Sequence, residues 1–430
     1  GGHARAWLLD LVRHDARRGL AVATRLAATP KAVTSVSRPF FDGWFMRLTD
    51  HGSGLSLAVV LGLFWPGNRR KRKTTDTRME HYICVSCSGD AQATLACTHL
   101  FPDPERTTLM LSSRGREVTN LPLRQSQVWS APVLGHGELR YESAEFGSIA
   151  VEPSKLTVAL RAPGGWELDL TASGAQRPWA AEGWLGRLGP LGVLPCRYRV
   201  KTMSTSARYR VQAPLPIVGS STDRGADTAA IENHGAGGPL RASGEGSLHV
   251  ECNFGESFPA GWIYAQGHGR AVTQGVDELR FVLTGGRFKI GPLEPFTWLL
   301  HIDGLPGGST LSFRTTDLDR VDMLEINPDA GTVALNFARP LWRRSGSRLA
   351  QLSIRLQAPP SSFGDDPLFV PTRDGFAQNP GTVESFAAVA EICYGAAAGT
   401  DTQTFTMRGC LLEFGGSLRD PEVCARALGF

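Results

Sequence analysis

The sequence predicts an all-β protein made of two antiparallel halves, each a barrel or sandwich, preceded by a short amphipathic helix. Short runs of β-branched and aromatic residues, bounded by Gly, Pro, Asp or Ser, recur from residue 38 to the C-terminus. Strands and helices do not alternate along the chain, which argues against a doubly wound parallel sheet. A polar, glycine-rich connector at residues 219–246 divides the β-rich sequence into two parts.

Residues 1–37 are predicted to form a basic amphipathic helix. Apolar residues recur at helical spacing within residues 5–27, arginines occupy many of the remaining positions, and Pro30 ends the pattern. Such a helix either lies on an anionic membrane surface or docks on its own domain, and the sequence leaves both alternatives open.

The first β half is predicted at residues 38–218. Its longest apolar run, Leu55 to Trp65, contains Ser56 and Gly62. This run is shorter than the ~18 residues that a spanning helix needs, so it is predicted to be a buried strand. The basic loop at residues 67–78 is either a solvated hairpin tip or a contact surface for acidic lipid or a protein partner.

The second β half is predicted at residues 247–430, after the connector. It contains a long proline-rich loop at residues 358–381. Long loops inside compact β proteins often form the lid or the mouth of a site, so this loop is a candidate for that role.

Composition and motifs exclude several classes of function. The 430 residues carry a net charge of only +4, and basic residues do not cluster with aromatic ones, so no nucleic-acid partner is expected. The sequence has no phosphate-binding loop, dinucleotide fingerprint, nucleophile elbow or H-E-x-x-H motif. The eight cysteines are scattered, with one C-x-x-C at Cys84 and Cys87, and are predicted to be buried or half-buried thiols in a reducing compartment. We therefore expect no cofactor and no metal.

The stretch HVECNFGESFPAGWIYAQGHG, residues 249–269, is unusual for strand sequence. It places a carboxylate, an amide, a thiol and several aromatic rings around a Phe-Pro turn, where an ordinary strand would alternate apolar and polar residues. This combination marks the stretch as a candidate site.

Three stretches resemble motifs of the tocopherol cyclase family. RPFFDGWFMRLT, which starts at Arg38, resembles the family's F-F-E-G-W-Y motif. VECNFGESFPAGWIYAQ, which starts at Val250, resembles E-K-N-W-G followed by F-P, a Trp and a Gln. AEICYGAAAGTDTQTFTM, which starts at Ala390, resembles a later C-Y-G stretch. The three matches occur in the family's order and extend from Phe40 to Met407.

The resemblance implies two lipocalin-like halves, related to carotenoid hydratase and AttH-type proteins. It implies cyclisation of a prenyl (phytyl) benzoquinol to a chromanol, as in vitamin E biosynthesis, in a plastid, at the thylakoid or the plastoglobule. A mitochondrial location is the alternative. The sequence departs from the family pattern at four positions: Asp42 replaces Glu, Phe45 replaces Tyr, and Cys252 and Phe254 replace Lys and Trp. These departures leave the implied activity open.

The implied ring closure needs an acid, a cation-stabilising wall and a group that acts on the phenol. Glu251 is predicted to be the acid, because an apolar pocket raises the pKa of a carboxyl group. Asn253 is predicted to hold the quinol head, and Asp42 to orient or deprotonate the phenol. The apolar tail is expected inside a lipocalin-like barrel. Aromatic faces stabilise a cation by about 0.5–2 kcal/mol each. The predicted substrate-binding residues are Trp44, Phe254, Trp262, Tyr264, Gln266 and Tyr394.

Each of these residues also has a structural interpretation. Glu251 can pair with an arginine such as Arg270, Asn253 can serve a turn, and both tryptophans can be core residues. Two other functions therefore stay open. One is a non-catalytic protein that binds a lipid, quinone or pigment. The other is a structural subunit of an organellar membrane complex, with residues 5–27 and 67–78 as contact surfaces and a cavity filled by side chains.

Overall fold

The computed structural model describes residues 40–65, 80–89, 96–113, 116–122, 138–174, 179, 196–214, 230–231, 239–269, 278–288, 294–305, 308–338, 349–372, 374–396 and 402–427. The predicted N-terminal helix and the basic loop at residues 67–78 lie outside these residues. Within them, strands of two antiparallel sheets dominate, and the predicted all-β, two-half, lipocalin-like fold is confirmed. No helix in the described ranges combines the length and apolar composition that crossing a bilayer requires.

The first sheet has 13 strands within the described residues, in the order β4-β3-β2-β1-β13-β11-β10-β9-β8-β7-β5-β6, with β12 paired to β13. The strands are β1 (Phe40–Asp50), β2 (Leu55–Trp65), β3 (Glu80–Ser88), β4 (Ala96–Leu100), β5 (Thr107–Ser113), β6 (Arg116–Pro122), β7 (Glu138–Ser143), β8 (Gly147–Val151), β9 (Lys155–Ala162), β10 (Trp166–Ser173), β11 (Cys196–Ala213), β12 (Ala230–Ile231) and β13 (Leu240–Gly255). Short 3₁₀ turns occur at Pro104–Arg106 and Pro163–Gly165.

The second sheet has ten strands within the described residues, in the order β17-β16-β15-β14-β23-β22-β20-β19-β18, with β21 paired to β22. The strands are β14 (Gly261–Gly269), β15 (Leu279–Arg287), β16 (Phe296–Leu305), β17 (Ser309–Arg314), β18 (Arg320–Asn327), β19 (Thr332–Ala338), β20 (Leu349–Gln357), β21 (Leu368–Pro371), β22 (Phe376–Ala396) and β23 (Gln403–Gly416). Helix α2 (Pro421–Ala427) follows, and 3₁₀ turns occur at Thr315–Asp317, Pro360–Ser362 and Ser417–Arg419.

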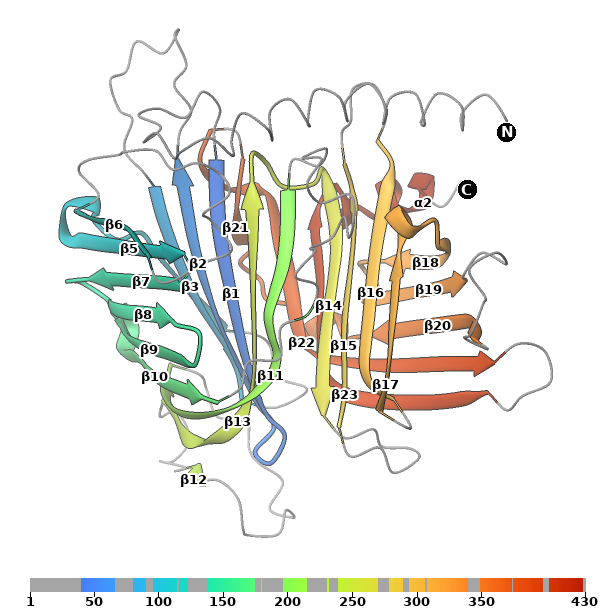
Figure 1. Cartoon of the computed structure of the whole chain (residues 1–430), viewed down its shortest axis with the longest axis horizontal. Coiled ribbons are helices and arrows are strands. Elements are labelled where there is room, and N and C mark those ends of the chain that lie inside the picture. The colour runs from blue at the N-terminus through green and yellow to red at the C-terminus, as the bar shows by residue number, and fades with distance from the viewer. Residues whose placement is uncertain are drawn as a thin grey trace, which may run out of the picture.

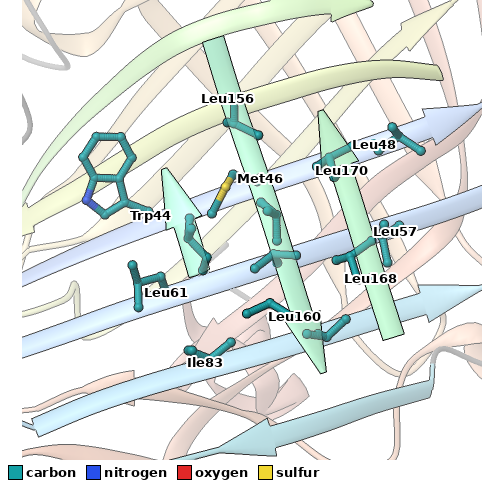
Figure 2. Packing of buried hydrophobic residues seen from close by; sticks show 14 of the residues in the cluster. Trp44, Met46, Leu48, Leu57, Leu61, Ile83, Leu156, Leu160, Leu168 and Leu170 are labelled. Atoms are coloured by element: carbon teal, nitrogen blue, oxygen red, sulfur yellow. The ribbon is translucent and has the colours of Figure 1, made fainter. Parts of the chain in front are cut away.

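Each sheet curls over its own apolar core. In the first half, the short strands β5 and β7 to β10 run steeply across the long strands β1 to β3 (Figure 1). In the second half, β18 to β20 run steeply across β14 to β16. β9 alternates buried and exposed side chains because one face lies on this core and the other faces solvent. Figure 2 shows Leu156 and Leu160 of β9 over Met46 and Leu61. Apolar side chains of β9 and of the long strands therefore form one core inside the first half.

A third apolar layer lies between the two halves. It joins Phe41 and Phe45 of β1 and Tyr198 of β11 to Trp262 and Tyr264 of β14. The central strands are thus covered on both faces, by their own core and by the other half. This explains why β2, the predicted buried strand, is apolar along nearly its whole length instead of alternating.

The boundary between the sheets differs from the predicted domain limits. The second half was predicted to begin at residue 247, after a connector at 219–246. Instead, β13 runs unbroken from Leu240 to Gly255 and pairs on both sides within the first sheet, with β1 and β11. The chain passes to the second sheet between Gly255 and Gly261, at the Phe-Pro turn. Two-sided pairing holds β13 in the first sheet, although its sequence closely precedes that of β14.

Candidate functional site

A cavity of about 110 Å³ opens between the two halves. In the first half, apolar side chains form a core, and the expectation that an apolar tail lies inside a barrel stays a prediction. The cavity lies beside the third apolar layer. Its walls include six of the nine predicted site residues. These are Asp42, Trp44, Glu251, Asn253, Trp262 and Tyr264.

The predicted lid loop forms one wall of this cavity. Leu368, Phe369 and Val370 of β21 line it, together with Phe376 at the start of β22. The Phe376 ring occupies the space beside Gly62, where any Cβ would come within 2.7 Å of the ring. A glycine in the otherwise apolar β2 therefore lets a segment of the second half pack closely on the first.

The strand pleat separates the three predicted catalytic residues. Glu251 pairs with Phe45, and Asn253 with Gly43, so these four share the face that looks towards the second half. Asp42 lies on the opposite face of β1, with Trp44 in the core of the first half (Figure 2). Asp42 therefore does not join Glu251 and Asn253 in one side-chain cluster, although its segment forms part of the wall.

Asp42 is fully buried inside the first half. Burial raises the pKa of this carboxyl group to about 7, an effect that the nearby Trp44 indole and Lys201 ammonium group partly offset. The Lys201 ammonium lies 5.2 Å from the centre of the Trp44 ring. The predicted phenol-activating role of Asp42 stays a prediction, and its position argues against it.

Glu251 is the centre of a buried hydrogen-bond network. Its Oε2 atom accepts hydrogen bonds from the hydroxyl groups of Tyr198 at 2.5 Å and Tyr264 at 2.6 Å. The Nε2 atom of His249 lies 2.9 Å from the same oxygen. Burial, followed by the charge of Glu251, raises the pKa of both tyrosines well above the ordinary value, so both hydroxyl groups stay protonated. Arg270, the predicted alternative partner, lies outside the described residues.

Two further carboxylates, which the sequence analysis missed, face the same cavity. Glu384 of β22 and Glu413 of β23 are cross-strand partners, and both line the cavity. The Trp262 indole donates a hydrogen bond of 2.5 Å to Oε1 of Glu413. Ser86 of the first half donates one of 3.2 Å to Oε1 of Glu384. Oε2 of Glu384 is buried and has no hydrogen-bond partner among the described residues.

At neutral pH Glu384 is protonated and Glu413 is partly protonated. Burial, and then the proximity of Glu413, raises the pKa of Glu384 to about 8. Burial raises the pKa of Glu413 to about 7, against the opposing effect of the Trp262 hydrogen bond. Two adjacent carboxylates do not ionise together in a low-dielectric site, which is the arrangement that keeps a general acid protonated.

Trp262 reaches Glu413 because the residue paired with it on the neighbouring strand is a glycine. Trp262 of β14 pairs with Gly415 of β23, and a Cβ at residue 415 would lie 1.9 Å from the indole ring. The indole therefore lies flat across the neighbouring strand, which directs its N–H towards Glu413. Gly415 is a positioning residue of the site.

Three predicted substrate-binding residues lie away from the cavity. Phe254 packs in the core of the first half. Gln266 accepts a hydrogen bond of 2.9 Å from Arg47, in a contact that joins the two sheets. Tyr394, near the end of β22, stacks on Phe405 and donates its hydroxyl proton to Gln403. The structure gives each of these residues a structural contact, and none of them borders the cavity.

The sequence did contain a signal for the missed acids. Glu413 stands alone in the apolar run LLEF, and Glu384 stands in TVESF next to further apolar residues. Charged residues are almost never fully buried unless they are paired, so a single Glu in an apolar strand is a candidate for a buried acid. For Tyr198, which has no motif around it, we find no comparable signal.

We expect the contribution of Glu384 and Glu413 to stability to fall as the pH rises from about 5 to about 9. Glu384 and Glu413 have folded-state pKa values above their ordinary 4.5. The stability from such groups is complete below the unfolded-state pKa and is lost as the pH rises through the folded-state value. Each pKa unit corresponds to about 1.4 kcal/mol, so the loss is several kcal/mol in order of magnitude.

Urea denaturation across this pH range measures the effect. The double variant Glu384→Gln/Glu413→Gln should show a smaller decline than the wild type, with the part due to buried Asp42 remaining, whereas Glu391→Gln, on an exposed position of β22, should match the wild type. Equal slopes for the wild type and the double variant would contradict a buried protonated pair.

Fold and site together define a class: a lipocalin-like protein of two β halves, with an acid-containing aromatic cavity between them. The crystal structure of CghA with Sch210972 is similar to the chain, with a TM-score of 0.51 and 12% identity over 87% of this chain and 88% of that chain. A putative AttH from Nitrosomonas europaea gives a TM-score of 0.37 and 11% identity over 87% and 92%. The similarity to CghA supports the fold.

No protein-family model matches the sequence, and no curated protein matches it. Membership of the tocopherol cyclase family therefore stays a prediction, while the two-half lipocalin-like fold that the resemblance implied is confirmed.

Proposed function

We propose that the protein is a tocopherol cyclase-like enzyme that closes a prenyl benzoquinol to a chromanol in the cavity between its halves. The observation that carries the proposal is Oε2 of Glu384, a buried carboxyl oxygen with no hydrogen-bond partner among the described residues. With a pKa of about 8, this carboxyl group is protonated at neutral pH. Glu384 thus replaces Glu251 as the proposed proton donor.

The proposed reaction needs no net proton. Glu384 transfers its proton to one alkene carbon, which forms a C–H bond and leaves a tertiary cation on the other. The rings of Phe41, Phe258 and Trp262 line the cavity and offer faces to this cation. The phenol oxygen then forms the C–O bond and releases its proton to Glu251 through the hydroxyl group of Tyr264 or Tyr198. Return of a proton to Glu384 completes an isomerisation.

The size of the cavity limits which part of the substrate it holds. An engineered cavity of ~150 Å³ accepts benzene, so about 110 Å³ suits part of an aromatic head group and not a phytyl chain. We place the quinol ring near Glu384 and Glu413, and the tail along the wall formed by Leu368 and Phe369. The wall formed by β21 must move outwards for the tail to enter.

A second candidate is a non-catalytic binder of a lipid, quinone or pigment. The observation that favours it is the internal pairing of polar groups, because Glu251 and Glu413 already accept hydrogen bonds from Tyr264 and Trp262. Such groups line a pocket without acting on its contents. For either candidate function, we also propose a plastid location and contact with membranes or with organellar protein partners.

A turnover assay separates the two candidates. The purified protein is incubated anaerobically with prenyl benzoquinols of increasing tail length, and chromanol is measured by chromatography. The matched control is a benzoquinol whose tail lacks the double bond, which should compete for binding without reacting. Chromanol formation that this analogue inhibits supports the cyclase. Saturable retention of the quinols without product overturns the enzyme proposal and leaves the binder.

A further inference from the structure

A second cluster of reactive side chains lies where the loop of the second half crosses the edge of the first sheet. Cys97 and His99 belong to β4, the edge strand, and Asp366 precedes β21. One potential ligand atom from each residue lies within 4.8 Å of the other two. We propose that these three residues form a binding site for a divalent transition-metal ion of the zinc class, a site independent of the proposed cyclase activity.

The geometry of the first two ligands fits zinc. Sγ of Cys97 lies 3.5 Å from Nε2 of His99. With Zn–S of about 2.3 Å and Zn–N of about 2.0 Å, a tetrahedral angle places sulfur and nitrogen about 3.5 Å apart. The two atoms therefore already have the separation that a shared tetrahedral ion imposes. Alternate residues of one strand share a face, which explains why a Cys-x-His pair on β4 converges.

A supporting hydrogen bond orients the histidine. Nδ1 of His99 lies 2.7 Å from the hydroxyl oxygen of Tyr82, which also accepts a weaker hydrogen bond of 3.3 Å from the backbone N–H of Phe369. Metal-binding histidines usually donate their other ring N–H to a carboxylate, a carbonyl or a water, and the Tyr82 hydroxyl oxygen would accept it here, which fixes the ring and leaves the remaining nitrogen for the ion. Here the free nitrogen is Nε2, the atom closest to Cys97.

The charge of the cluster suits a divalent cation. Cys97 offers a sulfur ligand and His99 an imidazole nitrogen, both of which zinc prefers. Thiolate is the form of cysteine that binds metals. Asp366 is exposed and supplies the carboxylate. The remaining coordination position is open to water, as in zinc sites with three protein ligands.

The ion would connect the two halves at the wall of the cavity. Cys97 and His99 come from the first sheet, whereas Asp366 lies two residues before Leu368, which lines the cavity. Tyr82, the partner of His99, lines the cavity as well. Metal binding would therefore hold the β21 wall in its closed position.

Direct metal binding tests the site. The full chain, purified under reducing conditions and stripped with a chelator, is titrated with Zn²⁺ and with Co²⁺ as a spectroscopic probe. We expect one ion per chain and a thiolate-to-cobalt charge-transfer band that Zn²⁺ abolishes. Cys97→Ser should remove the band, Asp366→Asn should weaken binding, and Cys393→Ser, at the other half-buried cysteine, should change neither. Tyr82→Phe should weaken binding roughly 10- to 100-fold.

Three results for the wild type and the ligand variants would overturn the proposal, and a fourth concerns the control. The first three are the absence of stoichiometric binding, a cobalt band that survives Cys97→Ser, and equal affinity in the Asp366→Asn and wild-type proteins. Asp366 is exposed, so Asp366→Asn should fold normally, and circular dichroism checks this for every variant. Loss of the band in Cys393→Ser as well would show non-specific thiol binding and would also overturn the site.

Discussion

The Glu384→Gln protein is expected to retain a prenyl benzoquinol but to form chromanol about 10²- to 10⁴-fold more slowly than the wild type. Glutamine keeps the size and the hydrogen-bonding capacity of a protonated glutamate but cannot deliver its proton. Because Ser86 contacts the other carboxyl oxygen, the side chain should stay in place. The effect should therefore appear in kcat, with little change in the amount of quinol retained at saturation.

The pH profile gives this prediction a second measurement. The acid form of Glu384 is the active one in the proposal, and its pKa is raised to about 8 by burial and by Glu413. The turnover rate of the wild type should therefore be highest at lower pH and fall as the pH rises through about 8. In Glu413→Gln the charge that helps to raise this pKa is absent, so the fall should move to lower pH.

The control for Glu384→Gln is Glu391→Gln, which removes a carboxylate from an exposed position of the same strand. Wild-type turnover in Glu391→Gln and slow turnover in Glu384→Gln would support the assignment. Unchanged chromanol formation in Glu384→Gln would exclude Glu384 as the proton donor. If Glu251→Gln alone then lost activity, the original assignment of the acid from the sequence would be correct instead.

The fold class was predictable because strand signals are local. Alternation in β9, apolar character in β2 and the turn residues between them all lie within short windows of sequence. Strand pairing is not local. β1 pairs with β13 across some 200 residues, and no feature of residues 240–255 indicates that they belong to the first sheet. This is why the predicted boundary at residue 247 fell inside a strand.

The candidate site was predicted in part for the same reason. Glu251, Asn253, Trp262 and Tyr264 lie in one short stretch, so a single motif located them at the cavity. Motif resemblance does not record which face of a strand a residue occupies. Asp42 was therefore grouped with Glu251, although the pleat places them on opposite faces.

Glu384 and Glu413 were missed because they come together only through strand pairing and the packing of the two halves. They become neighbours only through the register of β22 with β23, and they reach Glu251 only when the two halves pack together. Their raised pKa values arise from burial in that interface, which no single segment encodes. A site formed between domains is thus harder to predict than the domains themselves.

Arg47→Met is expected to lower the free energy of unfolding by about 3 kcal/mol, because it leaves buried acceptors unpaired. Arg47 is fully buried between the sheets. It donates hydrogen bonds to Gln266 at 2.9 Å, to the backbone oxygen of Gly409 at 2.6 Å, and to Ser56 at 3.2 Å. Burial lowers its pKa to about 10, so it remains a cation at neutral pH.

The acceptor at Gly409 depends on a β-bulge. Between Ala388 and Ala390 of β22, the opposing strand β23 carries one extra residue, and Gly409 adopts a positive φ of 67° there. A glycine in the left-handed region is typical of such bulges. Arg47 donates its hydrogen bond to the carbonyl of this bulge residue, so the backbone of β23 takes part in the contact between the halves.

Methionine fills much of the arginine's volume and removes the desolvated charge, which offsets part of the loss. It cannot pair with Gln266 or Gly409, and each unpaired buried acceptor costs about 1–3 kcal/mol. Urea midpoints at constant slope measure the difference, with Arg355→Met, at an exposed position of β20, as the control.

Equal midpoints for the two variants would show that relief of desolvation balances the lost hydrogen bonds, and that apolar packing holds the halves together. A separate early transition in Arg47→Met would show that the halves part before either unfolds. It would also identify Arg47 as the contact that keeps the cavity closed.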